Sequence, residues 1–388
     1  MHTIEASEKY LMKTYGRQPL AAASGTGCVC KDEDGKQYID FGSGIGTNSL
    51  GYCNAAWADA VCEQARKIQH TSNYYYTDVQ AVFAEKLCEL TGYTRMFLGN
   101  SGAEANECAI KLARKYSFDR YGEGRGTIIT LKNSFHGRTM MTLTATGQDV
   151  FHNYFFPFPT GFAYAAANDL DDLKSKLDGT VCAVMIELVQ GEGGVCALDY
   201  EYVQALAKLC QEQDILLIAD EVQTGVGRTG TFLASEQFGI HPNVTTLAKG
   251  LGGGLPIGCC LADEKCADVM GPSSHGSTFG GNPVVCAGAN AVLDQVTADG
   301  FLTEVQEKAA YIREAVSQCS DVAEVTGLGL MIGIRLKTKN AHDILVQARE
   351  QGLLVLTAKE NVRLLPPLTI TKEELDQGLK ILMPLLES

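Results

Sequence analysis

The sequence predicts an α/β protein with a large, mostly parallel sheet covered by helices on both faces and a small α+β domain assembled from both chain ends. From about residue 49 to residue 293, short apolar runs alternate with helix-like stretches, which is typical of parallel strands joined by crossover helices. The first 48 residues contain a hairpin pattern, and the tail contains helix and strand patterns that supply its partner. We therefore expect domain segments 1–48, 49–293 and 294–388, of which the first and last form the small domain.

The individual elements follow from local patterns. Two strand-like runs around a turn at Asp34-Gly35 predict a hairpin near the start. Five apolar runs predict strands of the large sheet, at Met96–Leu98, Thr127–Leu131, Val181–Ile186, Ile215–Ala219 and Val244–Ala248. Patterns in the tail predict a helix over 303–318, strands at Met331–Leu336 and Val362–Leu365, and a final helix from Lys372.

Composition and charge exclude several kinds of partner. The 388 residues carry a formal net charge of −14 without a basic block, which argues against binding to nucleic-acid phosphates. No apolar run has the length needed to cross a membrane, so we expect no membrane association. The 14 cysteines form no pair of C-x-x-C zinc knuckles, so we expect no metal. The start, MHTIEASEKY, lacks an apolar signal region, which indicates reduced thiols and a cytoplasmic protein.

A lysine and an aspartate each lie at the end of an apolar run, next to a glycine-rich turn. Lys249 follows the run VTTLA, where desolvation favours the neutral, nucleophilic amine that condenses with an aldehyde. Asp220 closes the run ILLIA, a position from which a buried carboxylate could hold a pyridine nitrogen protonated and make the ring an electron sink. Each residue alone has an ordinary explanation, such as a solvated strand cap. Together they are the pair that pyridoxal 5'-phosphate chemistry requires.

A helix start follows the first of the five predicted strands. The run NSGAEAN opens an apolar-periodic helix, with Ser101 and Glu104 in capping-box spacing. The ordinary interpretation is a helix start and nothing more. The functional interpretation is that Gly102 and Ala103 let backbone N–H groups approach a phosphate, whose charge the helix N-terminus stabilises.

The run SFHGRT lies just past the second predicted strand, at the edge where open α/β sheets collect ligands. Phe135 could stack there on an aromatic ring, and Arg138 could clamp a carboxylate through two parallel N–H bonds. The ordinary interpretations are a core phenylalanine and a surface arginine. His136 is expected to satisfy a backbone group rather than act in catalysis, because a lysine amine can itself move the proton.

These motifs resemble those of the class III aminotransferases over residues 15–368. The resemblance rests on the runs FGSGIG, NSGAEANE, SFHGRT, QGEGGV, DEVQTGVGRTG, TLAKGLGGGLPIG, HGSTFGGNP and RLLPP. It implies an aspartate-aminotransferase-like fold and pyridoxal phosphate as cofactor. Within this class the chain is most similar to the acetylornithine aminotransferases of arginine biosynthesis. Ornithine, succinylornithine, succinyl-diaminopimelate and 4-aminobutyrate stay open as donors, because one or two pocket contacts decide among them.

The resemblance implies a set of cofactor contacts. In this family the matching residues are Lys249 as covalent anchor, Asp220 at the pyridine nitrogen, Gln223 at the ring hydroxyl, Phe135 stacked on the ring, and the adjoining Glu221 and Val222. The cofactor phosphate is bound by Ser101, Gly102 and Ala103 and by Thr278 of the neighbouring subunit. The resemblance therefore implies a homodimer with shared active sites.

Substrate contacts are implied in the same way. Arg138 matches the arginine that holds the α-carboxylate of the donor, and Ser277 lies where the substrate contacts its loop. Glu192 and Arg363, which spacing alone cannot pair, resemble a switch that hides the arginine from the diamine donor and releases it for glutamate. One pocket must accept a neutral acetylated tail and then a second carboxylate. Ile45 stands where ornithine aminotransferases tend to carry tyrosine, which gives a less polar wall.

The sequence departs from the family pattern at two places, and it leaves three rival functions open. Leu188 replaces a usual proline and Gly51–Asn54 replaces a common Gly-His-x-His-Pro run, so donor preference stays open. Gly225–Gly230 fits the G-x-G-x-x-G of dinucleotide-binding oxidoreductases, although Asp220–Thr224 separates it from its strand. Two further rival functions are a non-catalytic domain that keeps the fold and an aminomutase that needs no external acceptor.

Overall fold

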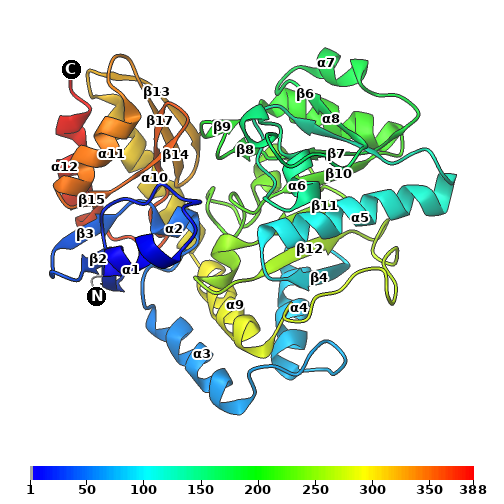
Figure 1. Ribbon diagram of the computed structural model, residues 1–388, viewed down its shortest axis with the longest axis horizontal. Helices are drawn as coiled ribbons and strands as arrows, with labels where there is room; N and C mark the ends of the chain where they lie inside the picture. The colour runs from blue at the N-terminus through cyan, green and yellow to red at the C-terminus, as the bar shows by residue number, and fades with distance from the viewer. Residues whose placement is uncertain (1–2) are drawn as a thin grey trace.

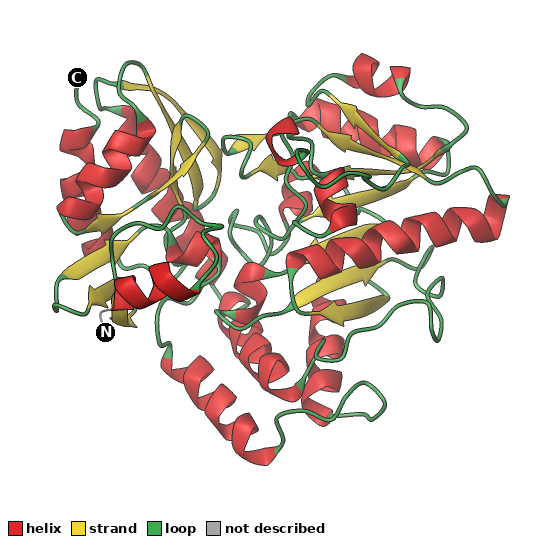
Figure 2. Ribbon diagram, viewed as in Figure 1, coloured by secondary structure: helices red, strands yellow, loops and turns green. Residues whose placement is uncertain are grey.

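In the computed structural model, which describes residues 3–388, the chain forms two lobes (Figure 1). A sheet lies between helices in the larger lobe, and elements from both chain ends lie together in the smaller one (Figure 2). The described part begins with helix α1 (Thr3–Tyr10). No helix among residues 3–388 is long and apolar enough to cross a membrane. The α/β prediction is confirmed.

The large sheet has seven strands. In spatial order they are β4 (Arg95–Gly99), β12 (Gly258–Ala262), β11 (Val244–Leu247), β10 (Leu216–Asp220), β7 (Val181–Ile186), β5 (Thr127–Leu131) and β6 (Phe162–Ala165). Strand β12 is antiparallel to both neighbours, and the other pairings are parallel. The five predicted strands are present to within one residue at each end, so the mostly parallel sheet is confirmed. Strands β6 and β12 were not predicted.

Helices cover both faces of this sheet. The helices of the large lobe are α3 (Ala55–Lys67), α4 (Asp78–Thr91), α5 (Gly102–Tyr121), α6 (Met140–Ala145), α7 (Leu170–Ser175), α8 (Tyr200–Glu212) and α9 (Pro283–Val296). Ile128 of β5 shares a buried cluster with Ile110 of α5, and its neighbour Ile129 shares another with Leu206 of α8. Successive side chains of a strand point to opposite faces, so these two clusters are the two faces of the sheet.

The smaller lobe contains two four-stranded sheets. The first consists of β1 (Ala22–Thr26), β2 (Val29–Asp32), β3 (Gln37–Asp40) and β15 (Leu353–Leu354); the second consists of β13 (Val322–Leu328), β14 (Met331–Leu336), β17 (Asn361–Leu364) and β16 (Leu356–Ala358). The helices are α10 (Phe301–Ser317), α11 (Ala341–Glu350) and α12 (Lys372–Leu385). Strands β2 and β3 form the predicted hairpin, and β15 of the tail lies parallel to β3. The hairpin therefore has its partner in the tail, as expected.

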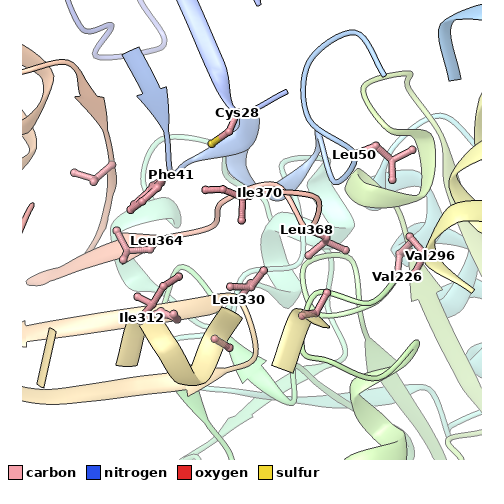
Figure 3. Packing of buried hydrophobic residues seen from close by; sticks show 14 of the residues in the cluster. Cys28, Phe41, Leu50, Val226, Val296, Ile312, Leu330, Leu364, Leu368 and Ile370 are labelled. Carbon is pink, nitrogen blue, oxygen red and sulfur yellow. The ribbon is translucent and has the colours of Figure 1, made fainter. Parts of the chain in front are cut away.

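The two lobes share one continuous core, shown in Figure 3. Phe41 near the start packs in the same cluster as Leu364 and Leu368 of the tail and Val226 and Val296 of the large lobe. Helix α9 also continues past residue 293, where the second boundary was expected. The boundaries at 48/49 and 293/294 stay a prediction.

Candidate active site

The motif-bearing loops meet at one edge of the large sheet. Strands β5, β7, β10 and β11 are parallel, and β4 runs with them because β4 and β11 are both antiparallel to β12. The loops after these strands enclose a cavity of about 450 Å³. The predicted site residues that line it are Ser101, Gly102, Ala103, Phe135, Arg138, Asp220, Val222, Gln223 and Lys249.

Lys249 begins a short helical turn, Lys249–Gly252, directly after β11. Its φ of +41° lies in the left-handed region that non-glycine residues rarely occupy. Such a backbone costs about 1–3 kcal/mol and persists where the surroundings enforce it, which is frequent at functional sites. Burial lowers the pKa of its amine to about 8, although the Glu192 carboxylate acts in the opposite direction. The amine is therefore partly neutral near pH 7, as its expected role requires.

Asp220 lies at the floor of the cavity, at the end of β10, and is buried. Its Oδ2 accepts hydrogen bonds from Asn106 Nδ2 and His136 Nδ1, both at 2.8 Å, and its Oδ1 accepts one from the Val222 amide at 3.1 Å. A carboxylate can accept about four hydrogen bonds, so one position remains for a ring N–H. The expectation that His136 satisfies a backbone group is wrong, because its Nδ1 lies 2.8 Å from Asp220 Oδ2.

The start of α5 faces the same cavity. Ser101 is the N-cap, and its Oγ accepts a hydrogen bond from the Glu104 amide at 3.2 Å. A side chain at Gly102 would come within 2.7 Å of Val222, so glycine is required for this close approach. The first amide groups of a helix have no partner within it, and those of Gly102 and Ala103 belong to residues that line the cavity. This arrangement suits a phosphate.

Phe135 and Arg138 line the same cavity as the helix start. The guanidinium of Arg138 lies 4.0 Å from the ring centroid of Phe151 and 5.4 Å from that of Phe135. Its side chain is exposed at the mouth, and among residues 3–388 it has no acidic partner. A free guanidinium held on aromatic rings can bind a substrate carboxylate.

Glu192 and Arg363, which the sequence could not pair, form an ion pair. Arg363 Nη1 donates to Glu192 Oε1 at 2.7 Å, and the arginine is buried. Glu192 lies on the turn between β8 (Val189–Gln190) and β9 (Cys196–Ala197), whereas Arg363 lies on β17 of the smaller lobe. Burial raises the pKa of Glu192, but the guanidinium outweighs it and the pKa lies below its usual value.

Six predicted residues lie apart from the cavity lining, namely Glu192 and Arg363, described above, and four others. Ile45 is exposed, in a left-handed turn, Ser43–Gly46. Ser277 is close, since its Oγ accepts a hydrogen bond from Asn100 Nδ2 at 3.0 Å. Thr278 lines a different cavity, beside residues 70–77 and 280–283. The Glu221 carboxylate accepts hydrogen bonds from the turn at 234–235 instead of facing the cavity.

Glu187, which the sequence analysis did not single out, also lines the cavity. Its carboxylate is buried at the end of β7, and burial raises its pKa to about 7 although His136 acts to lower it. The available signal was its position: it follows a predicted strand at the same sheet edge as Asp220 and Lys249.

The donor set fits pyridoxal 5'-phosphate. A partly neutral lysine, a carboxylate with one free acceptor position and a helix start with free amides meet in one cavity. In addition, Gln223 Oε1 is buried without a hydrogen-bond partner among residues 3–388, which suits a polar ligand atom.

Comparison with known proteins agrees with this geometry. The model of the family described as aminotransferase class-III matches residues 10–386. The chain belongs to the class-III aminotransferases. It is therefore a pyridoxal phosphate-dependent aminotransferase, and the predicted family, fold and cofactor are confirmed.

Relatives of this aminotransferase extend over its whole length. It is 52% identical to the acetylornithine aminotransferase of Haemophilus ducreyi, covering 97% of this chain and 96% of that one. The solved structure of Toxoplasma gondii ornithine aminotransferase is 30% identical, with a TM-score of 0.94 over 98% of this chain and 93% of that one. N-acetylornithine aminotransferase from Stenotrophomonas maltophilia is 35% identical, with a TM-score of 0.85 over 98% and 97%.

The dinucleotide-binding interpretation of Gly225–Gly230 is wrong. This turn is buried, and Arg228 Nη1 donates to the carbonyl oxygens of Leu330 and Pro366 of the smaller lobe. The glycine-rich turn therefore packs between the lobes, and residues 225–230 do not open a helix.

Proposed function

We propose that this aminotransferase moves the δ-amino group of N2-acetyl-L-ornithine to 2-oxoglutarate, giving N-acetyl-L-glutamate 5-semialdehyde and L-glutamate in arginine biosynthesis. The observation that carries the proposal is the Glu192–Arg363 ion pair of 2.7 Å beside the cavity of Lys249. While paired, the arginine is neutralised and the pocket suits an uncharged acetylated tail. When the pair opens, the arginine can hold the second carboxylate of glutamate.

Each residue has a physical role in this proposal. Bound pyridoxal phosphate would supply the electron sink and the carbonyl carbon that receives the amino group. Lys249 anchors the cofactor and carries the proton, and Asp220 keeps the pyridine nitrogen protonated. Phe135 stacks on the ring, and Arg138 holds the α-carboxylate of the substrate.

The remaining cofactor and substrate contacts are proposed on position and resemblance. They are Ser101, Gly102 and Ala103 at the phosphate, Gln223 and Val222 at the ring, Ser277 at the substrate, and Ile45 as an apolar wall. For Glu221 we propose a role through its backbone, because its side chain is engaged elsewhere.

We also propose a cytoplasmic homodimer. Thr278 lies away from the cavity of its own chain, which supports its expected contribution to a neighbouring subunit. Exposed aromatic residues nearby, including Tyr74, Tyr75, Tyr76 and Phe279, support a contact surface there. The 14 free cysteines support a reducing compartment.

The half-reactions test the donor assignment. The purified enzyme is mixed with N2-acetylornithine, ornithine or 4-aminobutyrate without an acceptor. The rate at which the absorbance of the yellow, aldehyde form of the cofactor is lost is then compared among the three amines. We expect acetylornithine to react fastest. A preference for ornithine or 4-aminobutyrate would keep the aminotransferase but overturn its donor, and isomerised product without 2-oxoglutarate would reveal an aminomutase.

A further inference from the structure

Glu187 is a buried carboxylate that the proposed reaction does not use. It lies between β7 and β8 and lines the cavity together with Asp220 and Lys249. Only 3% of the residue is exposed, so its charge interacts almost entirely with protein groups. A buried carboxylate is costly unless hydrogen bonds compensate it. The identity of its donors therefore indicates what it does.

Both donors are backbone amides of turns that reach the active site. The Phe135 amide donates to Glu187 Oε2 at 2.8 Å, and the Gly191 amide donates to Oε1 at 3.4 Å. The first turn carries the expected ring-stacking side chain. The second carries Glu192, one residue beyond Gly191. Glu187 thus joins the turn at the cofactor to the turn that holds the carboxylate of the ion pair.

The turn with Glu192 is also attached to other parts of the chain, and its Glu192 side chain has a hydrogen bond with Gln223. Gln190 Nε2 donates to the Lys132 carbonyl at 2.9 Å, and Asn361 Nδ2 donates to the Gly194 carbonyl at 2.7 Å. A side chain at Gly191 would come within 2.4 Å of Gln223, so this backbone also packs against a cavity residue. The Gly191 bond is the attachment on the cavity side, immediately before Glu192.

We propose that Glu187 is a positioning residue for substrate selection, because its carboxylate holds the Gly191 amide so that Glu192 stays on Arg363. This inference rests on the proposed function of the ion pair. Without the second acceptor oxygen, the turn loosens, Glu192 leaves the guanidinium more often, and Arg363 becomes available to a dicarboxylate.

A matched control exists in the smaller lobe. Asp321 is also buried and also accepts two backbone amide bonds, from Thr338 and Lys339 at 3.0 Å each. It directly precedes β13 and does not line the cavity. Asp321→Asn therefore removes a comparable acceptor without touching the Glu192 turn.

The test measures binding of two unreactive acids to the cofactor-loaded enzyme, through the change in cofactor absorbance. Glutarate has two carboxylates and needs Arg363, whereas pentanoate has one. We expect Glu187→Gln to lower the Kd of glutarate relative to that of pentanoate by about tenfold, since one of the two backbone amides loses its acceptor. We expect Asp321→Asn to leave this ratio within about twofold of the wild type.

A second variant changes the length of the side chain and keeps its carboxylate. Glu187→Asp keeps the charge but is one methylene too short to hold both amides, so it should shift the ratio in the same direction as Glu187→Gln. It also serves if the glutamine variant fails to fold. An unchanged or increased Kd ratio in the folded variants would overturn the proposal. Because neither acid reacts, the Kd ratio tests the role of Glu187 even if acetylornithine proves not to be the donor.

Discussion

The proposed cofactor end of the site differs from its proposed specificity end in how the chain builds it. The cofactor end, here Ser101–Ala103, Phe135, Asp220 and Lys249, lines the cavity at the ends of strands of one sheet and on the loops after them. The specificity end, here Ile45, Glu192 and Arg363, lies beside that lining and comes from three separate segments, two of them in the smaller lobe. The position of the first is fixed by strand order, whereas that of the second depends on how the lobes pack. Substitutions can therefore change substrate choice while leaving the chemistry intact.

The largest effect is expected at the cofactor end. Lys249→Ala removes the covalent anchor and the proton carrier, so single-turnover reaction with glutamate should slow by about a thousandfold or more. The cofactor should remain bound, because its phosphate and ring contacts are on other loops. Absorbance after dialysis checks retention. Steady-state transamination within about tenfold of the wild-type rate would contradict the assignment of Lys249.

A smaller and selective effect is expected at the specificity end. Arg363→Ala removes the partner of the second carboxylate, so the KM for 2-oxoglutarate should rise about 10- to 100-fold. The rate of the half-reaction with acetylornithine should change only a few-fold, because that donor meets the arginine in its paired form. Stopped-flow comparison of the two half-reactions measures this difference. Equal losses in both would mean that the two ends are not separable.

Arg138 tests whether one residue serves both half-reactions. It lies at the mouth of the cavity on aromatic rings, without an acidic partner among residues 3–388. Arg138→Ala should raise the KM for acetylornithine and for glutamate by a similar factor, about tenfold. The control is Arg138→Lys, which keeps the charge but loses the two parallel bonds and should recover part of the affinity. An unchanged donor KM would assign the α-carboxylate to another residue.

The smallest effect concerns the stability of the cofactor-free protein. Lys249 has a folded-state pKa of about 8, below its unfolded value of 10.5. Protonation is therefore penalised in the folded state: the penalty is complete below pH 8, shrinks as pH rises towards 10.5, and vanishes above it. Lys249→Met should raise the Tm by about 2 °C at pH 7.5 and by less at pH 10. Scanning calorimetry at both pH values checks this, and an equal shift at both would point to packing instead of charge.

The same contrast explains what could be predicted from the sequence. Strands β5, β7 and β14 were predicted to the residue because their apolar runs are uninterrupted. Parallel strands end at a common edge, so Asp220 and Lys249 could be placed together. Glu192 and Arg363 are 171 residues apart, and no local pattern records which strand of another lobe faces a turn. Only resemblance paired them.

Two further misses have a physical origin. Strand β12 runs against its neighbours and carries small residues and cysteines in the run GCCLA, which lacks the β-branched side chains that signal a strand. The partner of His136 depends on how the loop after β5 lies against the end of β10, two strands away in the sheet. Such relations are set by tertiary packing, and the sequence pattern of either segment alone does not contain them.

The pairing of β3 with β15 also determines which lobe can be completed first during translation. Ile39 lies opposite Leu353 in this sheet, so about 310 residues must be translated after Ile39 before β3 can pair with β15. At 5–20 residues per second this takes roughly 15–60 s, while the sheet of the large lobe can already form. The Leu365 amide can donate to the Phe41 carbonyl only at the end of that interval. A ribosome-bound chain would thus hold its cofactor loops before it acquires any ability to choose a substrate.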